Sequence, residues 1–128
     1  MKIVIRDGLP FVSVTIRQEN RVLTLENVLL DTGSAGTVFP SDKLRNSGIA
    51  PQDTALIRRI TGVGGDEFVV ETAVDSVAVG HLQVTNFIVE AGAMDYRFEI
   101  EGILGFDFLQ QTGAIIDLGK MEMRQPQN

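Results

Sequence analysis

The chain has 128 residues and a mass of 14.0 kDa, which predicts one domain spanning residues 1–128. Eleven Lys and Arg residues against seventeen Asp and Glu residues give a net charge of −6. Because binding to a phosphate backbone needs a basic surface, we expect no nucleic-acid partner. The length leaves little room for two lobes, so a site with two matching halves would take its second half from another chain.

Cysteine is absent, and His81 is the only histidine in the sequence. Disulfides, cysteine zinc sites, thiol nucleophiles and multi-histidine metal clusters are therefore excluded. We expect neither a metal nor a cofactor. His81 follows Gly80 and is interpreted as a solvated turn residue rather than a catalytic one.

Apolar residues never occur in runs longer than three, as in Ile3-Val4-Ile5. Such runs are too short for a transmembrane helix or for the apolar segment of a signal peptide. The sequence therefore predicts a cytoplasmic protein with no membrane insertion.

The first half of the chain is dominated by alternating apolar and polar residues. Pro10 to Ile16 alternates in this way, and after a turn at Asn20 the stretch Arg21–Leu30 continues as a second strand, which predicts a hairpin. A short helix is expected at Ser41–Arg45, between Pro40 and Gly48.

The second half repeats this pattern. Phe68–Val79 and Leu82–Glu90 are predicted as a second hairpin, and Phe106–Thr112 lies between two glycines as a second short helix. Ala114–Leu118 and Met121–Met123 are expected to form a last short pair of strands.

Strand-favouring residues are abundant, with 14 Val, 11 Ile and 9 Thr against 11 Leu and 8 Ala. Strands joined by glycine turns, with one or two short helices, predict an all-β fold, either a barrel or a sandwich. A faint internal repeat relates Leu29-Leu30-Asp31 to Ile103-Leu104-Gly105.

The most informative segment is Asp31-Thr32-Gly33-Ser34, which directly follows the apolar residues 28–30. An acid at this position can be aimed into a cleft, and the short hydroxyl side chains can donate hydrogen bonds to neighbouring oxygens. The alternative is an ordinary turn in which Asp31 caps backbone amides.

Residues 28–34 together with Thr37-Val38 resemble the active-site loop of the retropepsin-like aspartic proteases. Residues 102–109 resemble the second signature of that family, and residues 113–118 resemble the strand that follows it in bacterial single-domain members. Residues 57–70, with glycines at their centre, resemble the flap hairpin. The resemblance covers nearly the whole chain and implies a small closed β-barrel with a flap hairpin.

The resemblance also implies an activity and a set of residue roles. The chain would be an aspartic endopeptidase that cleaves polypeptides as a homodimer, with Asp31 of each subunit in a catalytic dyad. Thr32 would bond across the dimer interface, Gly33 would contact the substrate backbone, and Ser34 would support the carboxylate from the side.

Two further groups of residues receive roles from the same resemblance. The expected flap and substrate-binding residues are Thr61, Gly62, Val63, Gly64 and Gly65. The expected lining of the apolar subsites is Val38, Phe39 and Leu104, together with Val63. Phe106, Phe108 and Leu109 are expected to pack the second helix against the barrel, and Gly105 to let that helix approach the Asp31 loop.

The sequence departs from retroviral members at two places. Ala35 and Gly36 stand where those members often carry acids that bind the substrate backbone. The tail after Met123 is short and polar, so a dimer interface could be built without interleaved terminal strands.

Other interpretations stay open at this point. The chain could be a catalytically inactive dimeric domain of the same fold that binds peptides or serves as a scaffold, or a monomeric barrel with a coincidental turn. The glycines at 62–65 could be a simple mobile hairpin. A phosphate-binding loop is disfavoured there because Asp66 and Glu67 would repel phosphate.

Overall fold

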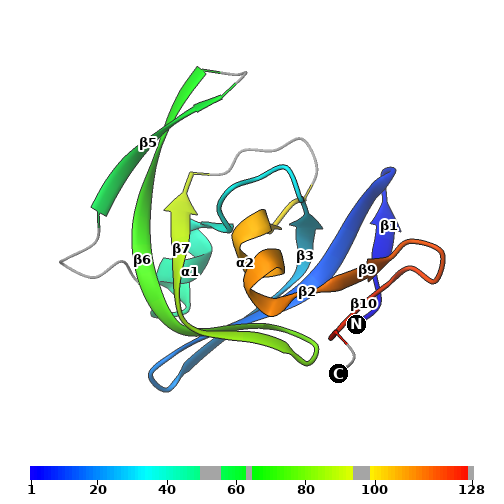
Figure 1. The fold of residues 1–128 in the computed structure, drawn as a ribbon. Helices are drawn as coiled ribbons and strands as arrows, with labels where there is room; N and C mark the ends of the chain where they lie inside the picture. Colours follow the sequence, from blue (N-terminus) through cyan, green and yellow to red (C-terminus); the bar gives the residue numbers. More distant parts are fainter. Residues whose placement is uncertain (50–55, 63–64, 94–98, 127–128) are drawn as a thin grey trace.

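The computed structural model describes residues 1–49, 56–62, 65–93 and 99–126, with residues 56–62 and 65–69 described by their backbone alone. Six strands form a closed barrel, because the first and last strands of the row, β2 (Leu9–Gln18) and β6 (Gly65–Val79), also pair with each other (Figure 1). In order around the barrel they are β2, β3 (Arg21–Leu30), β8 (Gly102–Leu104), β4 (Val38–Pro40), β7 (Leu82–Gly92) and β6. The predicted small closed β-barrel is confirmed.

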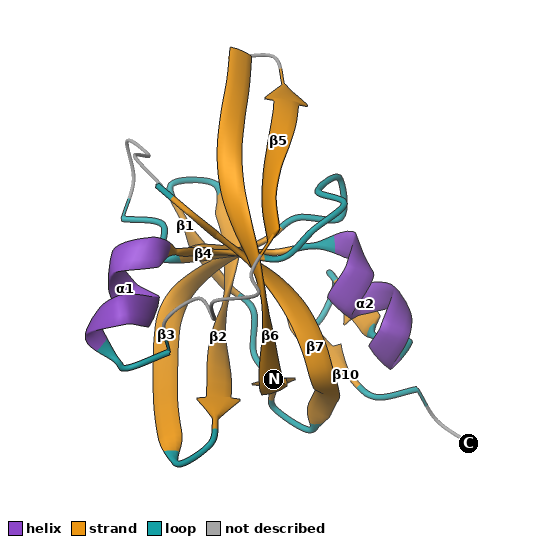
Figure 2. Ribbon diagram, turned by 90° about the vertical axis from the view of Figure 1, so that its left-hand side faces the viewer, coloured by secondary structure: helices purple, strands orange, loops and turns teal. Residues whose placement is uncertain are grey.

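The remaining elements attach to this barrel. They are β1 (Val4–Arg6) beside β2, β5 (Leu56–Gly62) beside β6, the pair β9 (Ile115–Asp117) and β10 (Glu122–Arg124), and the helices α1 (Ser41–Asn46) and α2 (Phe106–Thr112). Figure 2 shows the two helices on opposite sides of the barrel. Helix α2 has the predicted bounds and ends at Gly113, whose φ of 66° is the left-handed conformation that commonly closes a helix.

Both long hairpins follow the predicted pattern. β2 and β3 pair antiparallel up to Gln18 and Arg21, and β6 and β7 pair up to Val79 and Leu82. The second turn uses Gly80, whose φ of 59° suits glycine. Strands and turns therefore lie where the alternation of apolar residues predicted them.

The hairpin of β5 and β6 extends beyond the barrel (Figure 2). The last two pairs of this hairpin join Thr61 to Asp66 and Gly62 to Gly65. The expected flap residues Val63 and Gly64 lie outside the described residues.

The faint internal repeat becomes a pair of neighbouring parallel strands. Leu29 pairs with Ile103 and Leu30 with Leu104, so β3 and β8 run in the same direction side by side. β4 completes the group, since Val38 pairs with Ile103. The segments that leave β3 and β8 therefore begin at the same end of the barrel, and one of them is the Asp31 loop.

The core lies inside the barrel and under α2. Phe108 is fully buried and meets Phe87 edge to face, with ring centroids 6.1 Å apart, and Leu109 is buried beside it. Phe106, which was expected to join them, is 49% exposed instead. It occupies the first position of α2 and lies about 200° around the helix axis from Phe108, so it points away from the side on which Phe108 packs.

The two ends of the described chain lie close together (Figure 1). The amino group of Met1 donates to the carbonyl of Met123 at 2.9 Å, and the Met123 N–H donates to the Met1 carbonyl at 2.7 Å. Lys2 pairs with Glu122 in a β-bridge. The first residues and β10 thus pair within one chain. No helix in the described ranges has the length and apolar character needed to cross a membrane.

Candidate active site

Asp31 continues the pairing of β3 with β8. Its N–H donates to the Leu104 carbonyl at 3.0 Å, so the backbone on which the carboxylate sits is held by the barrel. The Gly33 N–H donates to Asp31 Oδ1 at 3.0 Å, and the Ser34 N–H donates to the Asp31 carbonyl at 3.2 Å. The side chain is half-buried, and Oδ2 accepts no hydrogen bond from any residue that the structure describes. One carboxylate oxygen is therefore fixed, and the other is available to a reactant.

The loop after Asp31 rests on a buried polar group. Thr37 has no exposed surface; its hydroxyl donates to Asp107 Oδ1 at 2.7 Å and accepts from the Gly105 N–H at 3.0 Å. The same Asp107 oxygen accepts from the Phe108 N–H at 2.8 Å. These contacts tie the Asp31 loop to the start of α2. Asp107 was not predicted as a support residue, because nothing in the spacing of Thr37 and Asp107 shows that they meet.

Gly105 allows the loop and α2 to touch. A Cβ placed on Gly105 would overlap the carbonyl of Gly36, and the Phe106 N–H donates to the Ser34 carbonyl at 2.7 Å. The expected close approach is confirmed.

The absence of a side chain at Gly36 has a structural reason. A Cβ there would meet the carboxylate of Glu90, a residue that is only 7% exposed. The Glu90 side chain, which comes from β7, therefore already occupies the space beside this position, where retroviral members often carry an acid.

The two other residues of the predicted site loop lie as follows. The Ser34 hydroxyl donates to the Gly36 carbonyl at 2.8 Å, so in this structure it shapes the loop instead of supporting the carboxylate of Asp31. Thr32 is exposed at the tip of the loop. Its bond across a dimer interface stays a prediction, as does the contact of Gly33 with substrate.

Two of the residues expected to line subsites lie in the core. Phe39 and Leu104 have no exposed surface and cannot contact a substrate in this structure, whereas Val38 is half-buried. The prediction failed for these two because both members of an apolar pair such as Ile103-Leu104 look alike in sequence, although they point to opposite faces of a strand.

The face that carries Asp31 is instead occupied by Leu29 and Ile103. Leu29 is two residues before Asp31 and therefore shares its face, and its neighbour Ile103 is paired both with it and with Val38. All three apolar side chains are half-buried. They form an apolar wall next to the carboxylate. The position of Leu29 in this wall could have been predicted from the sequence, because Leu29 lies two residues before Asp31.

The flap predictions reach only the backbone of the hairpin. Thr61, Gly62 and Gly65 lie at the described end of β5 and β6, and their contact with a substrate remains a prediction. Among the described residues, no three His, Asp or Glu side chains come together as a metal-binding group.

The fold and this site define a class of protein: a small β-barrel that presents one carboxylate at the end of a core strand, beside an apolar wall and a long hairpin. The family profile described as "Aspartyl protease" matches residues 12–108. The chain therefore belongs to the aspartyl protease family, of the retropepsin-like type. Comparison with curated proteins found no match.

Proposed function

We propose that the protein is an aspartic endopeptidase that works as a homodimer, with Asp31 of two copies forming one catalytic dyad. The observation that carries this proposal is the Asp31 carboxylate itself. It is held from one side by the Gly33 N–H, and its second oxygen makes no hydrogen bond within the described part of the chain. A single chain supplies one such group, which is half of the site that the chemistry needs.

The reaction needs two carboxylates in different protonation states. When two carboxyl groups lie side by side they cannot both ionise, so the pair holds one proton. The ionised group takes a proton from a water molecule whose oxygen attacks the peptide carbonyl, while the protonated group donates to the carbonyl oxygen. The tetrahedral intermediate then loses its C–N bond as a proton passes to nitrogen. The products are a carboxylic acid and an amine, and no covalent enzyme intermediate forms.

The rest of the site would position the substrate. An extended peptide would lie under the β5–β6 hairpin and hydrogen-bond through its backbone to the hairpin and the Asp31 loop. The apolar wall of Leu29, Val38 and Ile103 would receive a side chain next to the scissile bond. Closure of the hairpin would exclude bulk water.

The test is the substitution Asp31→Asn. The asparagine side chain keeps an oxygen for the Gly33 N–H, so the loop should keep its shape, but the general base is lost. We expect cleavage of a diverse peptide mixture, followed by mass spectrometry between pH 3 and 8, to fall about a thousandfold or more. The dimer measured by sedimentation should be unchanged.

The control is Glu26→Gln, which removes one exposed carboxylate from β3 without touching the loop. It should cleave like the unmodified protein. Cleavage that survives Asp31→Asn would contradict the proposal. A protein that binds peptides but cuts none at any pH would instead be the inactive peptide-binding domain considered above.

A further inference from the structure

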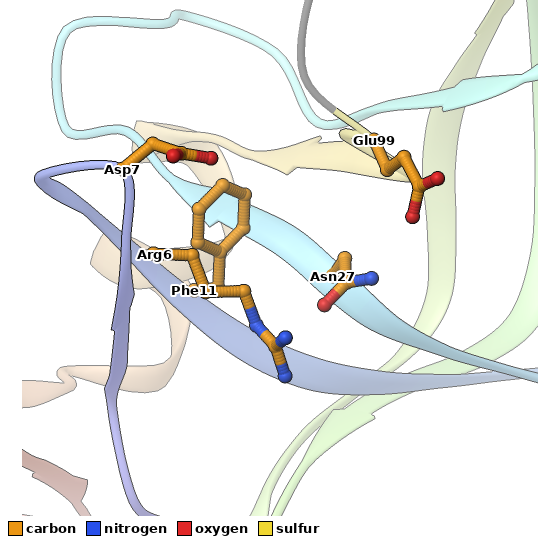
Figure 3. A pocket seen from close by; sticks show the side chains of 5 residues that line it. All are labelled: Arg6, Asp7, Phe11, Asn27 and Glu99. Carbon is orange, nitrogen blue, oxygen red and sulfur yellow. The ribbon is translucent and has the colours of Figure 1, made fainter.

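A polar depression lies beside the apolar wall. One part of it, shown in Figure 3, has a volume of about 290 Å³, and an adjoining part has a volume of about 460 Å³. The first part is lined by Arg6, Asp7, Phe11, Asn27 and Glu99. The second is lined by Asn27, Pro40, Asp42, Lys43, Glu99, Ile100 and Glu101. Because the two parts share Asn27 and Glu99, we treat them as one pocket, named the Asn27 pocket.

The Asn27 pocket opens on the face of β3 that carries Asp31. Asn27, Leu29 and Asp31 are spaced by two residues and are all half-buried, whereas Val28 and Leu30 between them are buried in the core. Four residues of strand correspond to roughly 13 Å. A peptide in extended conformation spans that distance with about four residues, so the pocket is within reach of a substrate side chain about four positions from the scissile bond.

The charges of the pocket are predominantly negative. Asp7, Asp42, Glu99 and Glu101 contribute carboxylates, against the cations Arg6 and Lys43. Lys43 lies 3.7 Å from Glu101, whose other oxygen accepts from the Asn27 N–H at 3.1 Å. Across the described ranges Asp7 and Glu99 make no ion pair, so their charges are uncommitted.

Asn27 adds an acceptor to these charges. Its side-chain oxygen is buried and has no hydrogen-bond partner among the described residues. A buried acceptor without a partner is costly, and a donor that enters the pocket would relieve this cost once the amide turns its oxygen toward that donor. The ammonium of lysine and the guanidinium of arginine carry several donors and no acceptor. The half-buried Ile100 offers apolar surface for the methylene stem of such a side chain.

We propose that the Asn27 pocket selects substrates with a lysine or arginine about four residues from the scissile bond. This inference rests on the proposed peptidase function and deepens it, because it names the class of peptide that the site would prefer. In a symmetric dimer the pocket occurs twice, so a basic residue on either side of the bond would be recognised.

The experiment uses a cleavable peptide in which one lysine replaces alanine at successive positions along the sequence. For the unmodified protein, kcat/KM should rise about fivefold for lysine at the responsive position, as expected for a partly exposed ion pair, and the rise should shrink at high salt. Glu99→Gln and Asp7→Asn should each reduce this preference, measured as the ratio of kcat/KM for the lysine peptide to kcat/KM for the alanine peptide. Glu26→Gln, an exposed carboxylate on the same strand but outside the pocket, should keep the preference.

A preference that is the same in Glu99→Gln and in the unmodified protein, or a preference for glutamate over lysine, would overturn the inference. Binding of the lysine and alanine peptides to Asp31→Asn, measured by calorimetry, separates the two proposals. If the unmodified protein cuts nothing but the lysine peptide binds more tightly in a Glu99-dependent way, the pocket stands and the peptidase function fails. If cleavage occurs without any lysine preference, the function stands and the pocket proposal fails.

Discussion

At the scale of single residues, three aspartates show how partners decide what a carboxylate does. Asp31 accepts one backbone N–H and keeps an oxygen available within the described structure, which suits a group that must exchange protons. Asp107 accepts from the Thr37 hydroxyl and from backbone, and it supports the loop. Asp117 is the last residue of β9, with its carboxylate 3.1 Å from the Arg124 guanidinium. The same residue type thus has a candidate catalytic role, a supporting role and a local structural role.

Asp117 carries a prediction about pH. The Lys120 N–H, together with the Arg124 guanidinium, stabilises the charged carboxylate and lowers the pKa of Asp117 below its ordinary value near 3.8. A lowered pKa in the folded state means that the stabilisation is present above the ordinary pKa and is lost as the pH falls through the folded-state pKa. We therefore expect Asp117→Asn to be less stable than the unmodified protein at neutral pH, with a difference that shrinks below about pH 4. Urea unfolding of both proteins from pH 2 to 7 measures this, and a difference that grows toward acid would contradict it.

At the scale of elements, the candidate site depends on the parallel pair β3 and β8. Their pairing brings the Asp31 loop against the start of α2, although the two segments are about 70 residues apart in sequence, as the bond between Thr37 and Asp107 shows. The contact requires glycine at position 105, because a side chain there would overlap the backbone of Gly36. The loop is thus held by the barrel on one side and by a helix on the other.

Thr37→Val tests this arrangement. Valine has nearly the shape of threonine but cannot donate to the half-buried Asp107 or accept from the Gly105 N–H, which stays buried. We expect the free energy of unfolding to fall by about 2–3 kcal/mol, since the buried Gly105 N–H loses its acceptor and the half-buried Asp107 loses one donor, and peptide cleavage to fall with it. Thr37→Ser keeps the hydroxyl and should lose about 1 kcal/mol or less. If valine and serine destabilise the protein equally in urea unfolding, the hydroxyl does not support the loop.

At the scale of the whole molecule, the proposed dimer needs a surface that brings two Asp31 loops together. The first residues and β10 already pair with each other inside one chain. Phe106 is the large apolar side chain next to the loop, half exposed and bonded through its N–H to Ser34. We therefore expect Phe106 to lie in the dimer interface.

Phe106→Ser should weaken the dimer without unfolding the chain. Loss of a buried interface aromatic costs about 2 kcal/mol, so the dimer dissociation constant should rise at least about tenfold, and cleavage at low protein concentration should fall with it. The matched control is Val22→Ser, which removes an equally exposed apolar side chain (51%) near the far end of β3. Sedimentation velocity measures both, and equal dimer constants for the two variants would exclude Phe106 from the interface.

Local sequence patterns predicted the two long hairpins, helix α2 and the candidate acid that would activate the nucleophile. Alternation with a period of two placed the hairpins of β2–β3 and β6–β7, glycines bounded α2, and the Asp31-Thr32-Gly33-Ser34 segment indicated the reactive loop. These features are local, because strand alternation, turn chemistry and helix ends depend on residues only a few positions apart.

Which apolar side chains face the site depends on how the strands and helices pack together. It buried Phe39 and Leu104, exposed Phe106, and placed Leu29 and Ile103 beside Asp31. It also brought Asn27 and Glu99 into one pocket. The physical reason is that the burial of an apolar residue depends on which strand or helix packs over it, and closing a barrel joins strands that are distant in sequence.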